Sequence, residues 1–187
     1  MRRFSSYLKW AVTALAASLV FLTPAGAEED VELEALFEGL KGANAEAAVQ
    51  IEDRIYAIWS QSGSPAMDLL LERGRKALSE GDARLSIEHF TALIDHAPEF
   101  AEGYNGRATA HFQNGDFGQS LADIRQTLVL NPRHFGAMSG LALILEEIGK
   151  PEDALLAWRE VEALHPHREG LGDAILRLEK QVEGEAL

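Results

Sequence analysis

Apolar residues recur at three- and four-residue steps along most of the chain, as in helices that bury one stripe of side chains. Between residues 67 and 164 these amphipathic stretches fall into three successive pairs. The pairs are 67–80 with 83–97, 101–114 with 117–130, and 135–148 with 151–164. Strand-like alternation is absent from residue 28 onward. The pattern predicts an all-α fold built from helical hairpins.

A period of 34 residues relates the three pairs. It is carried by glycines at the expected end of each first helix and by prolines after each second helix. They are Gly81, Gly115 and Gly149, and Pro98, Pro132 and Pro166. Glycine tolerates the left-handed conformation that often ends a helix, and proline blocks further helix. The spacing predicts three equivalent helix–turn–helix units, at 67–100, 101–134 and 135–168.

Residue size repeats with the same period. The fourth and twenty-fourth positions are large, whereas the eighth and twentieth are small. The small residues are Gly74, Ala108 and Ala142 at the eighth position, and Ser86, Ser120 and Ala154 at the twentieth. Small residues allow the paired helices to approach closely, and Phe90, Ile124 and Trp158 at the twenty-fourth position are expected to fill the adjoining core.

These units resemble tetratricopeptide repeats (TPR), whose pattern is a 34-residue helix–turn–helix with the same size preferences. The middle unit is the closest, with the segments 101–105 and 113–117, Ala108, and Asn131-Pro132. The seventh position departs from the family pattern, because Arg73 and Arg107 stand where an apolar residue is usual. The resemblance covers about residues 67–166 and implies a right-handed helical solenoid of about three full repeats.

The two ends are expected to cap the solenoid. Residues 28–66 show two apolar stripes at helical spacing, one around Phe37 and one around Trp59, and resemble one degenerate repeat. Residues 169–187 are predicted to form a last helix and tail, with Leu171, Ile175 and Leu178 facing inward. Each unit of a solenoid buries its apolar stripe on its neighbours, so terminal units need such covers.

Residues 1–27 have the pattern of a secretory signal peptide. Arg2, Arg3 and Lys9 precede an apolar run from Trp10 to Leu22, and the segment ends in a small-residue triplet, 25–27. The run is short for a membrane span, which needs about 20 apolar residues, although an uncleaved anchor stays an alternative. Cleavage after Ala27 is predicted to place the product in the bacterial periplasm or outside the cell, with no stable membrane span.

Charge and composition narrow the function classes. The chain carries 30 acids against 17 Lys and Arg, with a net charge of −13, and cleavage would change this to −16. Binding to nucleic acid needs a concentrated positive face, so no nucleic-acid partner is expected. The chain has no cysteine, which excludes disulfides, cysteine nucleophiles and a lipid-modified cysteine.

No motif for catalysis, a cofactor or a metal is found. The sequence has no G-x-S-x-G, no P-loop and no H-E-x-x-H. Its six histidines occupy different positions in the repeats, and His111, beside Phe112, is the one expected to be partly buried. Adjacent acids diverge on a helix and are interpreted as solvated charges. We therefore predict no enzyme, no cofactor and no metal; an enzyme hidden in the repeats would need a convergent acid–base pair in a pocket.

The TPR resemblance implies that the first helices of the units line a concave groove for a partner peptide or helix. The residues expected to bind the partner are Leu71, Arg75, Asn105, Thr109, Phe112, Ser139, Leu143 and Glu147. The Lys/Asn/Arg clamp by which some members grip a terminal carboxylate is essentially absent. Glycines at 106, 136 and 140 are expected to leave open space for a bulky apolar segment. Alternatively, Leu71 and Leu143 pack between neighbouring helices.

The sequence thus favours a non-enzymatic scaffold or adaptor in the bacterial cell envelope, with a protein or peptide partner. The alternative within binding proteins is a periplasmic chaperone for an exported client, for example in cytochrome maturation or envelope assembly. A homo-oligomer, formed through the groove or an exposed helix, is a further alternative that the sequence leaves open.

Overall fold

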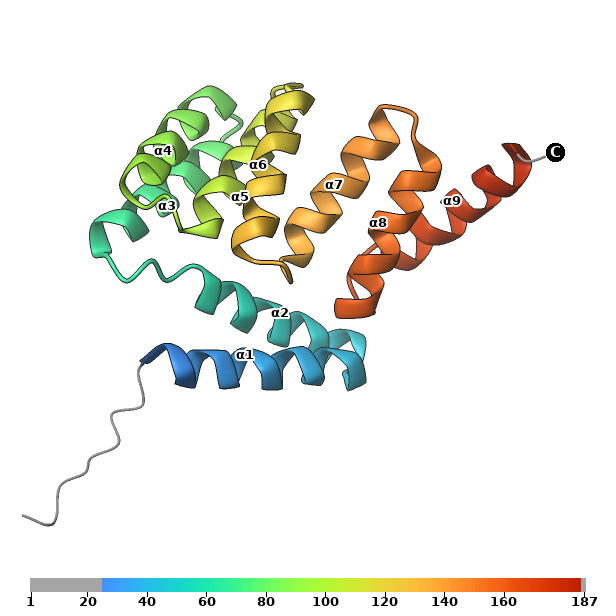
Figure 1. Ribbon diagram of the computed structural model, residues 1–187, viewed down its shortest axis with the longest axis horizontal. Coiled ribbons are helices and arrows are strands. Elements are labelled where there is room, and N and C mark those ends of the chain that lie inside the picture. Colours follow the sequence, from blue (N-terminus) through green and yellow to red (C-terminus); the bar gives the residue numbers. More distant parts are fainter. Residues whose placement is uncertain (1–24, 186–187) are drawn as a thin grey trace, which may run out of the picture.

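The computed structural model describes residues 25–185, which form nine α-helices and no strand (Figure 1). The helices are α1 (Ala25–Gly42), α2 (Ala45–Trp59), α3 (Pro65–Ser79), α4 (Ala83–His96), α5 (Ala101–Gln113), α6 (Phe117–Leu130), α7 (Phe135–Glu147), α8 (Pro151–Leu164) and α9 (Leu171–Glu185). The all-α class predicted from the sequence is confirmed. Of the predicted signal peptide, residues 1–24 lie outside the described residues.

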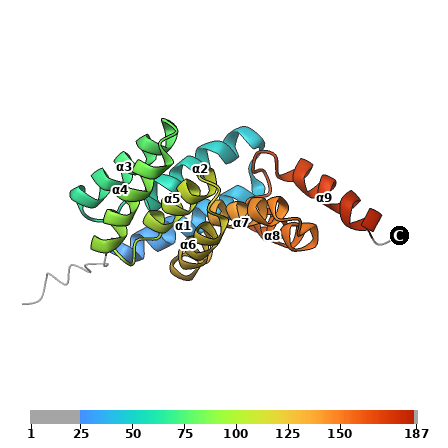
Figure 2. The ribbon, with the colours of Figure 1, turned by 90° about the horizontal axis from the view of Figure 1, so that it is seen from above.

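Helices α3 to α8 form three hairpins that stack side by side, as the 34-residue period predicts (Figures 1 and 2). The first helix of each hairpin ends at a glycine-containing turn. Gly81, Gly115 and Gly149 have φ angles of 81°, 80° and 71°, a region that favours glycine over residues with a Cβ. The repeat glycines therefore serve as the helix stops that the sequence indicates.

The small residues of each unit do place the paired helices close together. The Ser86 hydroxyl donates to the Gly74 carbonyl at 2.9 Å, and the Ser120 hydroxyl donates to the Ala108 carbonyl at 2.7 Å. Both bonds join the twentieth position of a unit to the eighth. They require backbones that approach within reach of one serine side chain, and they satisfy hydroxyls that are fully buried.

Arg107, which departs from the family pattern, has a specific partner in this chain. Its guanidinium makes two hydrogen bonds to the Asp123 carboxylate, at 2.7 and 2.8 Å, and a third to Thr91 at 3.2 Å. Asp123 is buried between α5 and α6 and needs such a partner. A bidentate ion pair replaces the apolar contact that is usual at this position.

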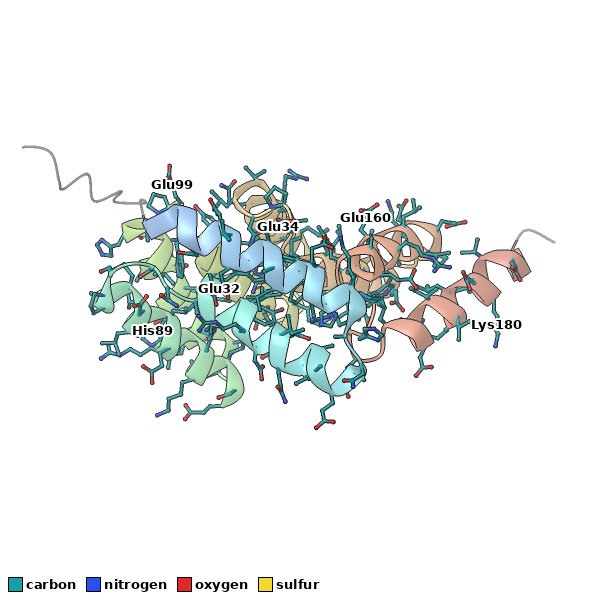
Figure 3. The ribbon with its side chains drawn as sticks, turned by 90° about the horizontal axis from the view of Figure 1, so that it is seen from below. Glu32, Glu34, His89, Glu99, Glu160 and Lys180 are labelled. Atoms are coloured by element: carbon teal, nitrogen blue, oxygen red, sulfur yellow. The ribbon has the colours of Figure 1, made fainter. Side chains whose placement is uncertain are left out.

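The N-terminal hairpin does not stack on α3 and α4 as a further repeat would. Instead, α1 and α2 run along the edge of the solenoid where the turns between repeats lie (Figures 1 and 3). In the view from below, both helices cross in front of the repeats, between His89 on α4 and Lys180 on α9 (Figure 3). The hairpin predicted at residues 28–66 is present, but it packs along the side of the solenoid where the inter-repeat turns lie and does not cover the first repeat, α3 and α4.

The apolar stripes of this hairpin are buried against the third repeat. Phe37, Leu40 and Ile55 share one core cluster with Phe135 and Trp158. The sequence indicates these buried stripes correctly, yet it does not indicate which surface covers them. They pack on helices that follow about 80 to 120 residues later in the chain.

Helix α9 covers the last repeat, as predicted. Leu171, Ile175 and Leu178 are buried in the same core cluster, against α8. None of the helices in the described part of the chain is long and apolar enough to cross a membrane.

Candidate partner-binding groove

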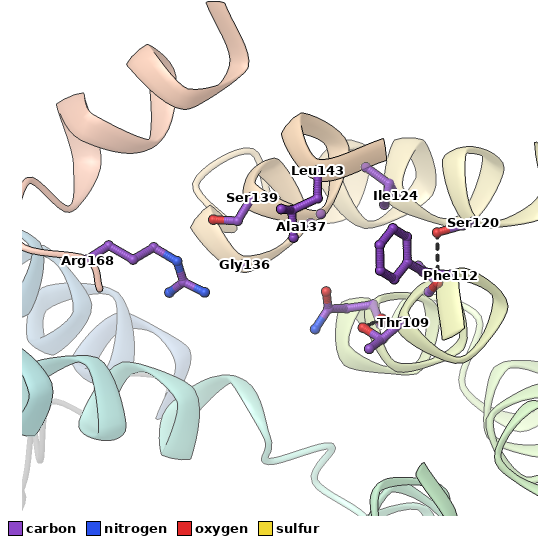
Figure 4. A pocket seen from close by; sticks show the side chains of 12 residues that line it. Thr109, Phe112, Ser120, Ile124, Gly136, Ala137, Ser139, Leu143 and Arg168 are labelled. Carbon is purple, nitrogen blue, oxygen red and sulfur yellow. Dashed lines mark hydrogen bonds between the residues drawn. The ribbon is translucent and has the colours of Figure 1, made fainter. Parts of the chain in front are cut away.

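A pocket of about 180 Å³ lies on the face formed by the first helices of the second and third repeats (Figure 4). Its walls come from α5, α6 and α7, and from the turn before α9. The lining residues are Asn105, Ala108, Thr109, Phe112, Ser120, Ile124, Gly136, Ala137, Ser139, Gly140, Leu143 and Arg168. The lining is mostly apolar, with a few hydroxyl and amide groups and one guanidinium, as in sites that hold a side chain or a small ligand.

Five of the eight residues predicted to bind a partner meet at this pocket. Asn105, Thr109 and Phe112 come from α5, and Ser139 and Leu143 come from α7. They lie at the fifth, ninth and twelfth positions of their units. Leu143 has 43% of its surface exposed, so its side chain is available to a bound segment. The periodicity of the repeats thus brings these residues to one concave surface.

The other three predicted residues lie elsewhere. Leu71 is only 3% exposed and packs against Phe90 and Leu93 in the first repeat, so its side chain is part of the core. Arg75 bonds to Ser60 and Glu102, away from the pocket. Glu147 is exposed but does not line the pocket. For Leu71 the correct interpretation is packing between helices, which the sequence leaves as an alternative.

Two of the three groove glycines do not leave the open space that we expected. A Cβ at Gly106 would collide with the Phe90 ring, and a Cβ at Gly136 would collide with the Tyr56 hydroxyl. These glycines instead allow a ring of a neighbouring helix to lie directly on the backbone. Only at Gly140, where Ile124 would lie 3.4 Å from a Cβ, would a methyl group fit in ordinary contact.

Arg168, from the turn between α8 and α9, is a pocket residue that the repeat pattern does not identify. Its guanidinium points toward the pocket from the side opposite Phe112 (Figure 4). The guanidinium donates a hydrogen bond to Glu52 of α2 at 2.7 Å. Its central carbon lies 5.3 Å from the centroid of the Phe135 ring. The N-terminal hairpin therefore supplies the counter-ion that neutralises this cation.

A buried polar cluster beside the groove joins α3 and α5 to His134, the residue that caps the start of α7. Glu102, which is 2% exposed, accepts from Arg75 at 2.5 Å and lies 2.7 Å from Nε2 of His134. Nδ1 of His134 accepts from the backbone N–H of Ala137 at 3.0 Å, so the neutral ring carries its proton on Nε2 and donates it to Glu102. Burial opposes the charge of Glu102, but His134 and Arg75 outweigh it and hold its pKa below the ordinary value.

A second polar cluster fixes α2 to the last inter-repeat turn. Glu52 accepts from Arg168 and lies 2.8 Å from Nε2 of His165. Burial raises the pKa of Glu52, yet the two basic partners hold it below its ordinary value. His134 and His165 are the most buried histidines among the described residues, and His111, which we expected to be partly buried, keeps 15% of its side chain exposed.

The first cluster is closed off from the groove, whereas the second reaches it through Arg168. Glu102 and His134 are enclosed by protein and do not line the pocket. Among the residues that the structure describes, no group of three or more His, Asp or Glu side chains is placed to hold a metal ion. The position of each cluster gives it a structural role, because the first joins α3, α5 and the start of α7, and the second joins α2 to the turn before α9.

A second, larger pocket of about 440 Å³ adjoins the first. It lies between α7 and α9 and shares Ser139, Leu143 and Arg168 with the first pocket. Its other lining residues are Glu146, Trp158, Glu169, Gly170, Asp173, Ala174 and Arg177. The concave face is therefore one continuous groove along α7, with an apolar part next to α5 and a charged part next to α9.

Comparison with known proteins agrees with the fold and the repeat pattern. A family model described as tetratricopeptide repeat matches residues 71–118 and 105–168. A TPR repeat-containing protein of Rhizobium etli is 32% identical over 153 residues, which are 81% of this chain and 75% of that protein. The chain therefore belongs to the tetratricopeptide repeat family.

Solved structures share the solenoid at low sequence identity. The first TPR of Spaghetti (RPAP3), bound to the HSP90 peptide SRMEEVD, superposes with a TM-score of 0.60 and 21% identity, over 63% of this chain and 93% of that chain. The TPR2B domain of yeast Sti1, in a complex with pHsp70, superposes with a TM-score of 0.58 and 19% identity, over 63% and 99% of the two chains. At these identities the likeness describes the fold alone.

Proposed function

We propose that this protein is an exported, non-enzymatic adaptor that binds a segment of a partner protein in the groove along α7. The observation that carries the proposal is the pocket between α5 and α7, because repeat-equivalent residues of the two helices converge on it. In solved structures with the same fold, the first TPR of Spaghetti is bound to an HSP90 peptide, and the TPR2B domain of yeast Sti1 is in a complex with pHsp70. A preformed pocket on a rigid array is well suited to receive one large side chain of such a segment.

The groove favours an apolar anchor over the acidic tail that some family members bind. Phe112 and Leu143 provide apolar surface, and Thr109, Asn105 and Ser139 provide hydrogen-bonding groups around it. The arginines that line the groove, Arg168 and Arg177, are already bonded to Glu52 and Glu146. Arg75, outside the groove, is bonded to Glu102. An acidic ligand would have to displace these carboxylates, which would then lose their counter-ions.

Export is inferred from the pattern of residues 1–27 alone. The proposal predicts that the cellular form begins at Glu28, with the apolar run removed. Intact-mass measurement of the protein from a periplasmic extract tests this. A chain that keeps residues 1–27 and sediments with membranes would refute the cleavage.

Photocrosslinking in intact cells tests the groove. A photoreactive residue at Thr109, which is exposed beside the pocket, is expected to capture a partner protein. The matched control is the same residue at Val129, which is 67% exposed on α6 and lies outside both pockets. Capture at Val129 without capture at Thr109 would show that the partner binds elsewhere.

A further inference from the structure

The charged part of the groove differs from the apolar part in a way that selects a ligand. The second pocket is lined by two cations, Arg168 and Arg177, and by three acids, Glu146, Glu169 and Asp173. Arg168 is bonded to Glu52 at 2.7 Å, and Arg177 is bonded to Glu146 at 2.6 Å. Both cations of this pocket are therefore neutralised within the protein.

Two acids on the same rim have no counter-ion. The side chains of Glu169 and Asp173 are exposed and, within the described part of the chain, form no hydrogen bond or ion pair. Glu146 differs from them, because it also accepts a hydrogen bond from the Trp158 indole at 2.7 Å. The unpaired charge of the pocket is thus entirely negative, and it lies on the turn before α9 and on the first turn of α9.

The apolar pocket and the pocket with the acidic rim adjoin along the groove, where they share Ser139, Leu143 and the neutralised Arg168. Leu143, which is shared by the two pockets, stands between Phe112 on one side and the acidic rim on the other. A peptide whose apolar side chain occupies the first pocket would carry its neighbouring residues over Glu169 and Asp173. Acidic residues at that place would be repelled, whereas a lysine or arginine would find an unpaired carboxylate.

We infer that the groove recognises a segment in which an apolar anchor residue is accompanied, on one side, by lysine or arginine. This inference rests on the proposed function of the groove and adds the chemistry of its partner: an amphipathic basic segment of a protein. The anchor provides burial between Phe112 and Leu143, and the basic residue fixes the direction in which the segment lies along α7.

The first step of the test is a selection that presupposes no partner. Random dodecapeptides displayed on phage are selected on the purified protein and, in parallel, on the variant Leu143→Asn. Leu143 is exposed, so the variant is expected to fold, and the uncharged amide removes the apolar anchor site without adding a charge to the groove. Peptides that bind the natural protein but not Leu143→Asn are bound at the groove. We expect these peptides to carry several times more Lys and Arg than Asp and Glu, on a constant side of an apolar residue.

The second step measures the charge dependence of one such peptide, labelled with fluorescein, by anisotropy. The double reversal Glu169→Lys with Asp173→Lys is expected to weaken binding about tenfold, because two exposed ion pairs become two repulsions. The matched control is Glu152→Lys with Asp153→Lys, two exposed acids in the first turn of α8 that lie outside the groove. The control is expected to change the affinity by less than about twofold, because salt screens exposed charges that lie outside the groove.

The outcomes separate this inference from the proposed function. If peptides depend on Leu143 but show no excess of basic residues, or if the double reversal leaves their affinity unchanged, the inference is wrong and the groove still binds peptides. If no selected peptide depends on Leu143, the groove itself is not the binding surface, and both proposals fail.

Discussion

The contact between Gly136 and Tyr56 gives a stringent test of where the N-terminal hairpin lies. Tyr56 of α2 covers the start of α7 so closely that a methyl group at residue 136 would overlap its hydroxyl. The ring has little freedom to move aside. It makes edge-on contacts with Trp59 and Phe135, whose ring centroids lie 5.6 and 5.3 Å away. Gly136→Ala should therefore force the hairpin and α7 apart.

The expected magnitude follows from two opposed effects. Replacing glycine by alanine within a helix stabilises it by about 0.5–1 kcal/mol, whereas overpacking a closed contact costs about 1–3 kcal/mol. We expect Gly136→Ala to lower the free energy of unfolding by about 1–2 kcal/mol overall. In the background Tyr56→Phe, which removes the overlapping oxygen, the same change should be neutral or stabilising.

The assay is chemical denaturation of four proteins that form a double-mutant cycle, with Gly118→Ala as the control. Gly118 is the second residue of α6, as Gly136 is of α7, but nothing lies within 4 Å of the position that its Cβ would take. Gly118→Ala should stabilise or have no effect. If Gly136→Ala behaves like Gly118→Ala, or if Tyr56→Phe does not relieve its cost, then α2 does not lie over the start of α7.

Three further predictions concern the core and the ion pairs. Trp158→Ala should cost about 3–5 kcal/mol in unfolding free energy, since the ring is buried in the largest cluster; a loss below about 1 kcal/mol would place the ring outside the core. Arg107→Leu should lower the free energy of unfolding by about 2–4 kcal/mol, because it leaves Asp123 buried without a partner. Adding Asp123→Leu should recover most of this loss, and chemical denaturation of the single and double variants measures both effects. The pKa values of Glu52 and Glu102 lie below their ordinary 4.5 in the folded protein. Their ionised carboxylates therefore contribute fully to the free energy of unfolding above about pH 4.5, and this contribution is lost as the pH falls toward the lower folded-state pKa values. Glu102→Gln should therefore make the free energy of unfolding less dependent on pH below about pH 5, as urea denaturation at a series of pH values can show. The same pH dependence in the variant as in the natural protein would show that Glu102 does not have a lowered pKa.

The parts of the fold that the sequence predicts are those determined by neighbours in the chain. The 34-residue period marks helix stops such as Gly115 and close contacts such as Ser120 on Ala108, because both arise within one hairpin. The position of the N-terminal hairpin depends on residues that are distant in sequence. The Trp59 ring stacks on the His134 ring, with 4.6 Å between the ring centroids. Nothing in the apolar stripe around Trp59 indicates this partner.

The groove could be predicted in part, for the same reason. Position within the repeat brings Asn105, Thr109 and Leu143 to one face, but it cannot separate a groove residue from a core residue at the same position. Leu71 and Asn105 occupy the same repeat position, and only Leu71 is covered by neighbouring side chains. Arg168 escaped prediction because it belongs to a turn and is directed toward the groove by Glu52, more than a hundred residues earlier.

The edge brace formed by α1 and α2 changes how such an array should come apart. Repeat arrays ordinarily lose order one unit at a time from an end, because each unit touches only its neighbours. Here the bonds from Glu52 to His165 and Arg168 span 113 and 116 residues, and the bond from Glu34 to Arg133 spans 99. The last repeat therefore cannot fray without releasing the first helices of the chain, so unfolding becomes a single concerted event. Such long-range contacts are also expected to slow folding, because α1 and α2 can pack only after the last repeat, much later in the chain, has formed.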